Sequence, residues 1–409
     1  MEKSKVPSSQ PSASSAASQR ARELLRLGVV LSEKCALEEA RNAFGEACRL
    51  ARSAGEVGLT AESIARLLRM ASESGDAAEA ASWERELKGV MASFPAQIPS
   101  MVWYCQAVIS GQKEEWREAQ SHLAQYLRAL EHEPEGTTTM GRREARARAW
   151  VMLGNTFVQR GHVRRAERTL QWVRREFESD RLPTINGLIA LQLGWIHLRR
   201  REAEAAAGWI EKAHAAFLAE HNWYNHLYVL YAYACLERVR GDYAKAQWYL
   251  ELLESATSAP GFGFFREQIA RERHRLQQDS VDLHIDGRKL QVRTRESTGI
   301  SLGKQYVLLH ILEALSEAHQ GESDHERGLS KAELIEKVWG ERYRPLIHDN
   351  KLYYNINRIR RLIEPDMKQP QYLLNWKEGY RLAPGLKVQV VGANNPLKKK
   401  SDRKRGGSQ

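Results

Sequence analysis

Residues 349–364, DNKLYYNINRIRRLIE, gather side chains of the types that bind nucleic acid. Lysine and arginine donate hydrogen bonds to phosphate oxygens and to guanine, and asparagine pairs with adenine. The segment is predicted to be a helix that begins at Asp349 as its N-cap and ends before Pro365. The predicted contact residues share one side of that helix and are Lys351, Tyr354, Asn355, Arg358 and Arg361.

The other side of the same segment is aliphatic. Its apolar residues recur at the i, i+4, i+7 and i+11 positions and are Leu352, Ile356, Ile359 and Ile363. This spacing predicts a stripe that packs against a hydrophobic core. A charged helix face alone is most often a solvated surface, so the elements around it must support an assignment to recognition.

Short strands and a helix are predicted upstream. Residues 281–294 alternate apolar and polar side chains around Asp286 and Gly287, which predicts a hairpin, and GISLG at 299–303 predicts a further strand. The polar residues 318–328 predict a loop. A helix is predicted between GISLG and this loop, with apolar positions at Tyr306, Leu309, Leu312 and Leu315.

A second helix and a hairpin complete this region. Ser330 and Glu333 have the spacing of a capping box, in which each residue satisfies a backbone N–H group of the other, so a helix is predicted to begin there. Residues 371–382, QYLLNWKEGYRL, predict two short strands joined at residues 375–379. The predicted DNA-contacting cations of this hairpin are Lys377 and Arg381.

Together these elements resemble the DNA-binding domain of OmpR/PhoB-type response regulators. The resemblance covers about residues 281–383 and is carried by AELIEKVWG, INRIRRLIEPD and YLLNWKEGYRL. It implies a winged helix whose third helix enters the major groove and whose wing reaches the minor groove. It adds Arg360 to the contact residues and implies that residues 341–348 form a loop presented to RNA polymerase. In this chain that loop carries Arg342, Tyr343 and Arg344.

The sequence departs from that family in two respects. The predicted wing is one residue shorter than usual, and its Thr-Val-x-Gly turn is replaced by residues 375–378, which argues against minor-groove contact. No acidic receiver domain is expected upstream, because that region follows a different pattern. Control by phosphorylation of the family kind is therefore not predicted.

The upstream region repeats itself with a period near 40 residues. In AWVMLGNTFVQRGHVRRAERTL, residues 149–170, the large and small residues follow the tetratricopeptide pattern, and the resemblance extends over about residues 21–260. Six repeats are predicted from small residues at equivalent positions, where two helices cross closely. These residues are Ala40, Ala80, Ala119, Ala166, Ala206 and Ala246.

The predicted fold is mainly α: a tetratricopeptide-like α-solenoid plus a small α+β winged helix-turn-helix domain. Residues 19–279 are assigned to the repeats, with a capping helix near their end, and residues 280–384 to the winged helix. Residues 1–18, rich in Ser, Pro and Ala, are predicted to be a disordered leader, and residues 385–409 a disordered basic tail.

Composition limits the classes of function. The net charge is +11, but seven basic residues against one acidic residue in 385–409 supply more than half of it, so charge alone indicates nucleic acid only weakly. The four cysteines lack metal-ligand spacing, and no secretory signal or long apolar run is present. A cytoplasmic protein that is not an enzyme is expected, without catalytic residues, metal, cofactor or membrane partner.

We therefore expect a bacterial transcription regulator. Its partners would be duplex DNA, RNA polymerase, and a protein, peptide or effector in the groove of the repeats, with homodimerisation open. The alternative is a PCI-like scaffold, which also places helical repeats before a winged helix but uses both for protein assembly. A scaffold has no need of the basic face formed by Lys351, Asn355, Arg358 and Arg361.

Overall fold

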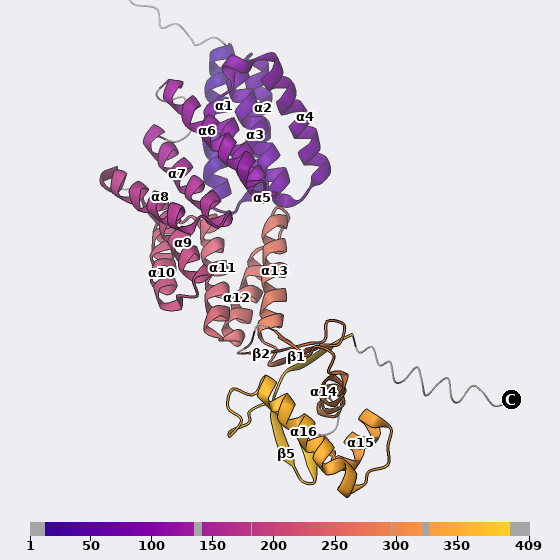
Figure 1. Ribbon diagram of the computed structural model, residues 1–409. Coiled ribbons are helices and arrows are strands. Elements are labelled where there is room, and N and C mark those ends of the chain that lie inside the picture. The colour runs from indigo at the N-terminus through magenta and orange to yellow at the C-terminus, as the bar shows by residue number, and fades with distance from the viewer. Residues whose placement is uncertain are drawn as a thin grey trace, which may run out of the picture. The chain divides into compact units, whose positions relative to one another are not determined.

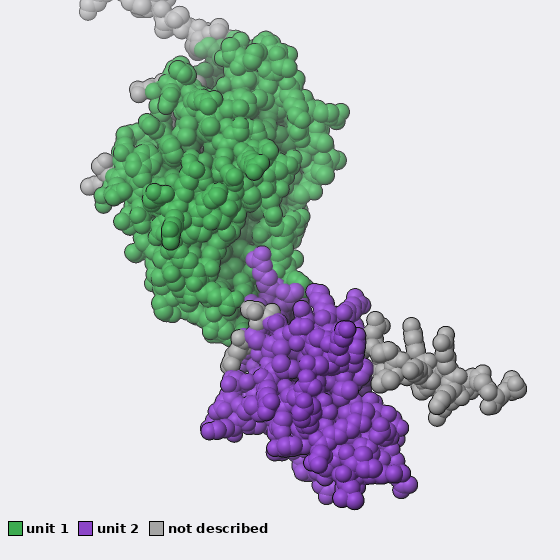
Figure 2. All heavy atoms as spheres, viewed as in Figure 1, with its two compact units in different colours: residues 1–274 green, residues 275–409 purple. Residues whose placement is uncertain are grey.

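The computed structural model describes residues 13–134, 141–180, 182–295, 297, 299–320 and 327–392. The chain divides into two compact units, residues 1–274 and 275–409, coloured separately in Figure 2. The first unit consists of helices, and the second combines helices with short strands (Figure 1). Each unit is described by itself.

The repeat unit is built from consecutive helix pairs joined by short turns (Figure 1). The first three pairs are α1 (Ala13–Glu33) with α2 (Leu37–Ser53), α3 (Val57–Ser74) with α4 (Ala77–Ser93), and α5 (Ser100–Gln112) with α6 (Trp116–His132). The next three are α7 (Arg142–Gln159) with α8 (Val163–Glu176), α9 (Pro183–Arg199) with α10 (Ala203–Ala219), and α11 (Trp223–Arg240) with α12 (Tyr243–Ala256). A final helix, α13 (Gly263–Asp279), follows them.

Small residues permit close packing inside each pair. The predicted alanines all lie in the first turns of the second helices, and five of the six are buried, Ala80 being half-buried. At Gly154 on α7, an added Cβ would lie 2.9 Å from Leu170 Cδ2 on α8, so a larger residue would force the two helices apart. The predicted tetratricopeptide-like solenoid is confirmed.

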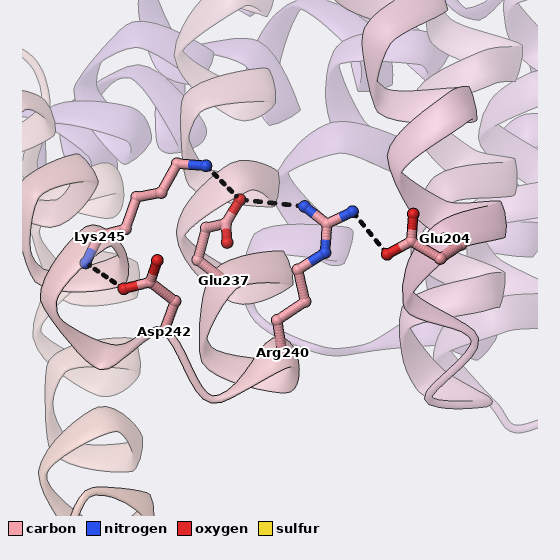
Figure 3. A network of polar contacts seen from close by, with 5 residues as sticks. All are labelled: Glu204, Glu237, Arg240, Asp242 and Lys245. Atoms are coloured by element: carbon pink, nitrogen blue, oxygen red, sulfur yellow. Dashed lines mark hydrogen bonds and ion pairs between the residues drawn. The ribbon is translucent and has the colours of Figure 1, made fainter.

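Ion pairs link successive repeats on the solenoid. Figure 3 shows Arg240 of α11 between Glu204 of α10, at 2.8 Å, and Glu237, at 3.2 Å. Lys245 of α12 contacts the same Glu237 carboxylate at 3.0 Å. The side chain of Asp242 caps α12 by accepting the backbone N–H of Lys245. The buried carboxylate of Glu237 is therefore shared by two cations.

The start of α1 corrects the predicted leader. The helix begins at Ala13, whereas residues 1–18 were expected to lack structure. Ser18 is buried, and its hydroxyl donates a 2.7 Å hydrogen bond to Glu56 Oε1. Alanine has the highest helix propensity, so the Ala-rich stretch extends the helix towards the N-terminus and packs its end on the turn before α3. Residues 1–12 lie outside the described residues.

The C-terminal unit opens with a four-stranded sheet of order β3-β2-β1-β7. Its strands are β1 (Leu283–Asp286), β2 (Gln291–Thr294), β3 (Ile300–Ser301) and β7 (Val388–Val391). The first two form the predicted hairpin, with Asp286 opposite Gln291. The last is parallel to β1, with Leu283 paired to Val388.

Strand β7 corrects the predicted basic tail. Residues 385–409 were expected to lack structure, but Val388–Val391 completes the sheet, and Val388 and Val390 pack against the core. Three of these four residues are valines, which favour a pleated, half-buried surface. The lysines before and after these valines gave the whole segment the composition of a polar tail. Residues 393–409 lie outside the described residues.

The rest of the unit surrounds one hydrophobic core. It comprises α14 (Tyr306–His319), β4 (Leu329–Ser330), α15 (Lys331–Trp339), α16 (Pro345–Ile363), β5 (Leu373–Trp376) and β6 (Gly379–Leu382). The last sheet has the order β4-β6-β5. On α14 the three predicted leucines are buried, whereas Tyr306 is exposed, since it begins the helix. Of the predicted loop, residues 318 and 319 are helical and 321–326 lie outside the described residues.

Candidate nucleic-acid interface

Helix α16 begins at Pro345 and not at the predicted Asp349. The buried ring of His348 explains the extra turn: its Nδ1 accepts the backbone N–H of Arg344 at 2.8 Å, and its Nε2 lies 2.8 Å from Glu341 Oε2. Proline suits the first position of a helix because its missing N–H would have no partner there. Asp349 instead accepts a hydrogen bond from the Tyr343 hydroxyl.

The aliphatic stripe of α16 is buried as predicted. Leu352, Ile356, Ile359 and Ile363 all belong to the core of the C-terminal unit. Burying such a side chain fully contributes about 1.5–3 kcal/mol. This packing fixes the rotation of α16 about its axis, and with it the direction of the opposite side.

The predicted contact residues lie on or beside that opposite side. Tyr354 and Arg361 are exposed, and Lys351, Asn355 and Arg358 are half-buried. The Arg358 guanidinium lies 5.5 Å from the centre of the Tyr354 ring. Among the described residues, no carboxylate pairs with Arg358 or Arg361. Their positive charges are therefore available to an external anion.

Two other contact residues are held by their own unit. The Asn355 amide donates to the Lys351 carbonyl at 2.7 Å. The Lys351 ammonium lies 3.5 Å from Glu341 Oε1 and 4.5 Å from the centre of the Trp339 ring. These contacts orient both side chains along the flank of α16.

Arg360 differs from its neighbours. Its Nε and Nη2 donate to the Leu373 carbonyl at 3.1 and 2.9 Å, and Nη2 also donates to Asn375 Oδ1 at 2.9 Å. The guanidinium lies 5.9 Å from the centre of the Tyr380 ring. Arg360 thus joins α16 to the β5–β6 hairpin, and the structure separates it from the outward arginines.

The wing is a tight hairpin. Trp376 pairs with Gly379 across a turn of two residues, so the strands extend further into the predicted 375–379 connection than expected. Lys377 in that turn has a φ of +47° and is exposed, with its ammonium 4.6 Å from the centre of the Trp376 ring. Arg381 on β6 is half-buried, and its Nε has no hydrogen-bond partner among the described residues. The tip of the wing presents one cation.

The connection between α15 and α16 is short and carries the residues predicted for polymerase contact. Arg342 and Arg344 are exposed, while Tyr343 is half-buried against Asp349. Directly after them, Leu346 on the first turn of α16 is 98% exposed.

Two asparagines on the outward side of α16 were not among the predicted contact residues. Asn350 is exposed and Asn357 half-buried, and with Tyr354 and Arg361 they recur at i, i+4, i+7 and i+11. This is the spacing of the buried stripe shifted by two residues, which turns a helix by about 200° and so reaches its opposite side. Applying the spacing of the buried stripe two residues earlier in the sequence identifies both asparagines.

The acids near α16 are committed to other partners. The hydrogen bond with His348 is the main cause that lowers the pKa of Glu341, and the Tyr343 hydroxyl is the main cause that lowers the pKa of Asp349. Lys331 adds an ion pair to Asp349 at 3.2 Å. Both acids stay ionised at neutral pH beside these partners, and neither forms a contact with Arg358 or Arg361 within the described part of the chain.

The C-terminal unit has three helices on two small sheets. The third of these helices has an outward basic side, and the β5–β6 hairpin is bonded to it. This arrangement defines a winged helix-turn-helix domain. Residues 310–382 match the family described as "Transcriptional regulatory protein, C terminal". The C-terminal unit carries an OmpR/PhoB-type DNA-binding domain, as the sequence predicted. The protein is thus a transcription regulator of bacterial type.

The comparisons say less about the repeats. Among solved structures, the chain is similar to one described as a functional characterization of Pseudomonas aeruginosa pilF, with 15% identity, a TM-score of 0.34, and coverage of 62% of this chain and 99% of that chain. No curated protein matches the chain. No helix in the described ranges is long and apolar enough to cross a membrane.

Proposed function

We propose that this regulator binds duplex DNA by laying α16 in the major groove, within a winged-helix domain that begins near residue 280 and includes β7. The observation that carries the proposal is the pair Arg358 and Arg361, whose guanidinium groups face away from the core without a carboxylate partner among the described residues. An arginine pairs with guanine or phosphate, and the neighbouring amides of Asn350 and Asn357 pair with adenine.

The remaining contact residues take supporting roles in this proposal. Lys351, Tyr354 and Asn355 flank the groove-facing residues, and Lys377 at the wing tip contacts phosphate with help from Arg381. Arg360 positions the wing through Leu373 and Asn375.

The other partners are also proposals. The connection with Arg342, Tyr343 and Arg344 contacts RNA polymerase. The repeat unit, residues 19–279, binds a regulatory protein, peptide or effector, or mediates self-association. The match to a transcription regulator favours DNA binding over assembly by a PCI-like scaffold.

Selection of duplexes from a random library by the full chain, followed by fluorescence anisotropy, tests the proposal. Replacing Arg358 and Arg361 together by Ala is expected to cost about 1–3 kcal/mol of binding free energy for each arginine. The slope of log K against log salt concentration is expected to become shallower by the amount that corresponds to about two phosphate contacts.

The matched control replaces Arg41 and Arg143, which already pair with Glu79 and Asp180, and is expected to leave affinity unchanged. If the double variant of α16 binds the selected duplex as tightly as the unchanged chain, the assigned face is wrong.

A further inference from the structure

The repeat array closes on itself. At Gly263, the first residue of α13, an added Cβ would lie 2.2 Å from the Ser74 carbonyl oxygen at the end of α3, so only glycine permits this approach of the two backbones. Arg271 of α13 forms a 2.9 Å ion pair with Glu114, and α1 contacts α11. The first and last repeats therefore meet.

Charged and aromatic side chains from five helices meet on this inner side. We call the interior cluster the group formed by Glu33, Arg69, Tyr104, Glu144, Arg148 and Tyr224. The Arg148 guanidinium lies 3.3 Å from Glu144 on its own helix and 3.8 Å from Glu33 on α1. Tyr104 interacts electrostatically with both Arg69 and Arg148.

The interior cluster is largely surrounded by protein but is still reached by solvent. Burial is the largest cause that raises the pKa of Glu33 and of the Tyr224 hydroxyl, so protein surrounds both groups. Nevertheless 37% of the Glu33 side chain, 30% of Glu144 and 29% of Arg69 remain exposed. These side chains therefore remain accessible to solvent on the inner side of the array.

Arg148 is the residue of the cluster with unused hydrogen-bonding capacity. Arg66 and Arg69 each hold a carboxylate one turn away, at 2.7 and 2.8 Å. The buried Nε of Arg148 has no partner among the described residues, and its contacts to carboxylates are longer. A buried donor without a partner costs about 1–3 kcal/mol, or more when it is charged, which a bound acceptor would recover.

We propose that the interior cluster binds a small zwitterion that carries a carboxylate and an amine, as a free amino acid does. The ligand carboxylate accepts hydrogen bonds from Nε and an Nη of Arg148 in the bidentate geometry of guanidinium–carboxylate pairs. The ligand ammonium donates to Glu33 and Glu144. This inference rests on the proposed regulatory role of the repeat unit and names the class of its effector.

The charges around Arg148 select this class. A purely anionic ligand would face two carboxylates against one guanidinium at Arg148, and a purely cationic one would leave the Nε donor unpaired. A ligand with both charges satisfies all three groups.

Thermal unfolding of the full chain in the presence of each common L-amino acid tests the inference. A molecule that binds only the folded state raises the unfolding temperature with its concentration. At least one amino acid is expected to raise it by several degrees, while the N-acetyl and carboxamide derivatives of that amino acid, each lacking one charge, do not. No shift with any amino acid, or equal shifts with the derivatives, would overturn the proposal.

Variants separate this site from the rest of the protein. Arg148→Met is expected to abolish the shift, and Glu144→Gln, a milder change if the first variant unfolds, to weaken it at least several-fold. Arg143→Met, on the same helix but paired with Asp180, is the matched control. A shift that persists in Glu144→Gln and Arg148→Met sinks the inference. DNA binding is measured separately, so its failure concerns only the proposed function.

Discussion

Arginines occur on both units, and their partners differ between the two. In the repeat unit, Arg41 contacts Glu79 at 2.9 Å, Arg200 contacts Glu167 at 2.8 Å, and Arg240 contacts two carboxylates. On α16, Arg358 and Arg361 have no carboxylate partner in the described part of the chain. The same side chain thus joins helices at these positions of the repeat unit and stays available at these two positions of α16.

For DNA binding, whether an arginine already has a carboxylate partner matters more than how many arginines the chain carries. Paired arginines at the surface contribute about 0–1 kcal/mol each and present no net charge to a polyanion. Two unpaired arginines on a rigid, outward helix side can bind phosphate or guanine without first losing another partner. A net charge of +11 did not distinguish these cases.

The strongest test of this difference gives Arg358 a carboxylate partner on its own helix. Tyr354→Glu places a carboxylate one turn before Arg358, where it pairs with the guanidinium and repels phosphate. DNA affinity, measured by anisotropy at fixed salt, is expected to fall about 10²-fold, near the upper end of what the loss of one arginine contact costs.

The conservative control is Tyr354→Phe. It keeps the ring under the guanidinium and is expected to change affinity only a few-fold. If Tyr354→Glu binds as well as Tyr354→Phe, the availability of Arg358 has no bearing on DNA binding.

Neighbouring arginines on α16 sharpen the comparison. Arg360→Met removes the donors of the buried Leu373 carbonyl and is expected to lower the stability of the C-terminal unit by about 1–3 kcal/mol. Arg361→Met is expected to leave stability unchanged and to weaken DNA binding. Hydrogen exchange of amides in α15 and α16 reports the first effect and anisotropy the second. Equal effects of both variants on stability would contradict the assignment.

The smallest expected effect concerns a neutral side chain in the same unit. Ser330 and Glu333 form the predicted capping box of α15, with Ser330 Oγ accepting the Glu333 backbone N–H. Ser330→Ala is expected to lower stability by about 0.5–2 kcal/mol and to leave DNA affinity nearly unchanged. Hydrogen exchange of the α15 amides measures it, and an unchanged exchange rate would show that the cap contributes nothing.

The cap also predicts a dependence on pH. Hydrogen bonding from the Ser330 backbone N–H, and then from its side chain, lowers the pKa of Glu333 in the folded chain. Its stabilising effect is therefore fully present above the unfolded pKa and is lost as the pH falls through the folded one. The difference in exchange between the unchanged chain and Glu333→Gln should vanish in acid. A difference that grows in acid would have the wrong sign.

Periodic features of the sequence predicted the fold well. The spacing of alanines placed the close crossings in the repeats, and the stripe from Leu352 to Ile363 predicted the buried side of α16. Both depend on local repetition, which the sequence displays directly. The OmpR/PhoB-type domain was identified instead from the resemblance of its motifs, such as AELIEKVWG and YLLNWKEGYRL, to that family.

Contacts made by individual side chains could not be predicted from the sequence pattern. The start of α16 depends on the ring of His348 reaching back to the Arg344 backbone, and the role of Arg360 depends on the Leu373 carbonyl that the fold brings to it. Helical spacing placed only Arg361 on the outward side, and the family resemblance added Arg360 without indicating its partner at Leu373. The interior cluster likewise exists only because closure brings α1, α3 and α7 together.

Strand β7 has a consequence for the order of folding. The helix pairs of the repeat unit connect neighbours in sequence, so each can form soon after it leaves the ribosome. The C-terminal unit pairs Leu283 with Val388, and until the later strand emerges one edge of β1 offers unpaired backbone groups. The repeat unit can thus fold during synthesis before the sheet of the C-terminal unit is complete.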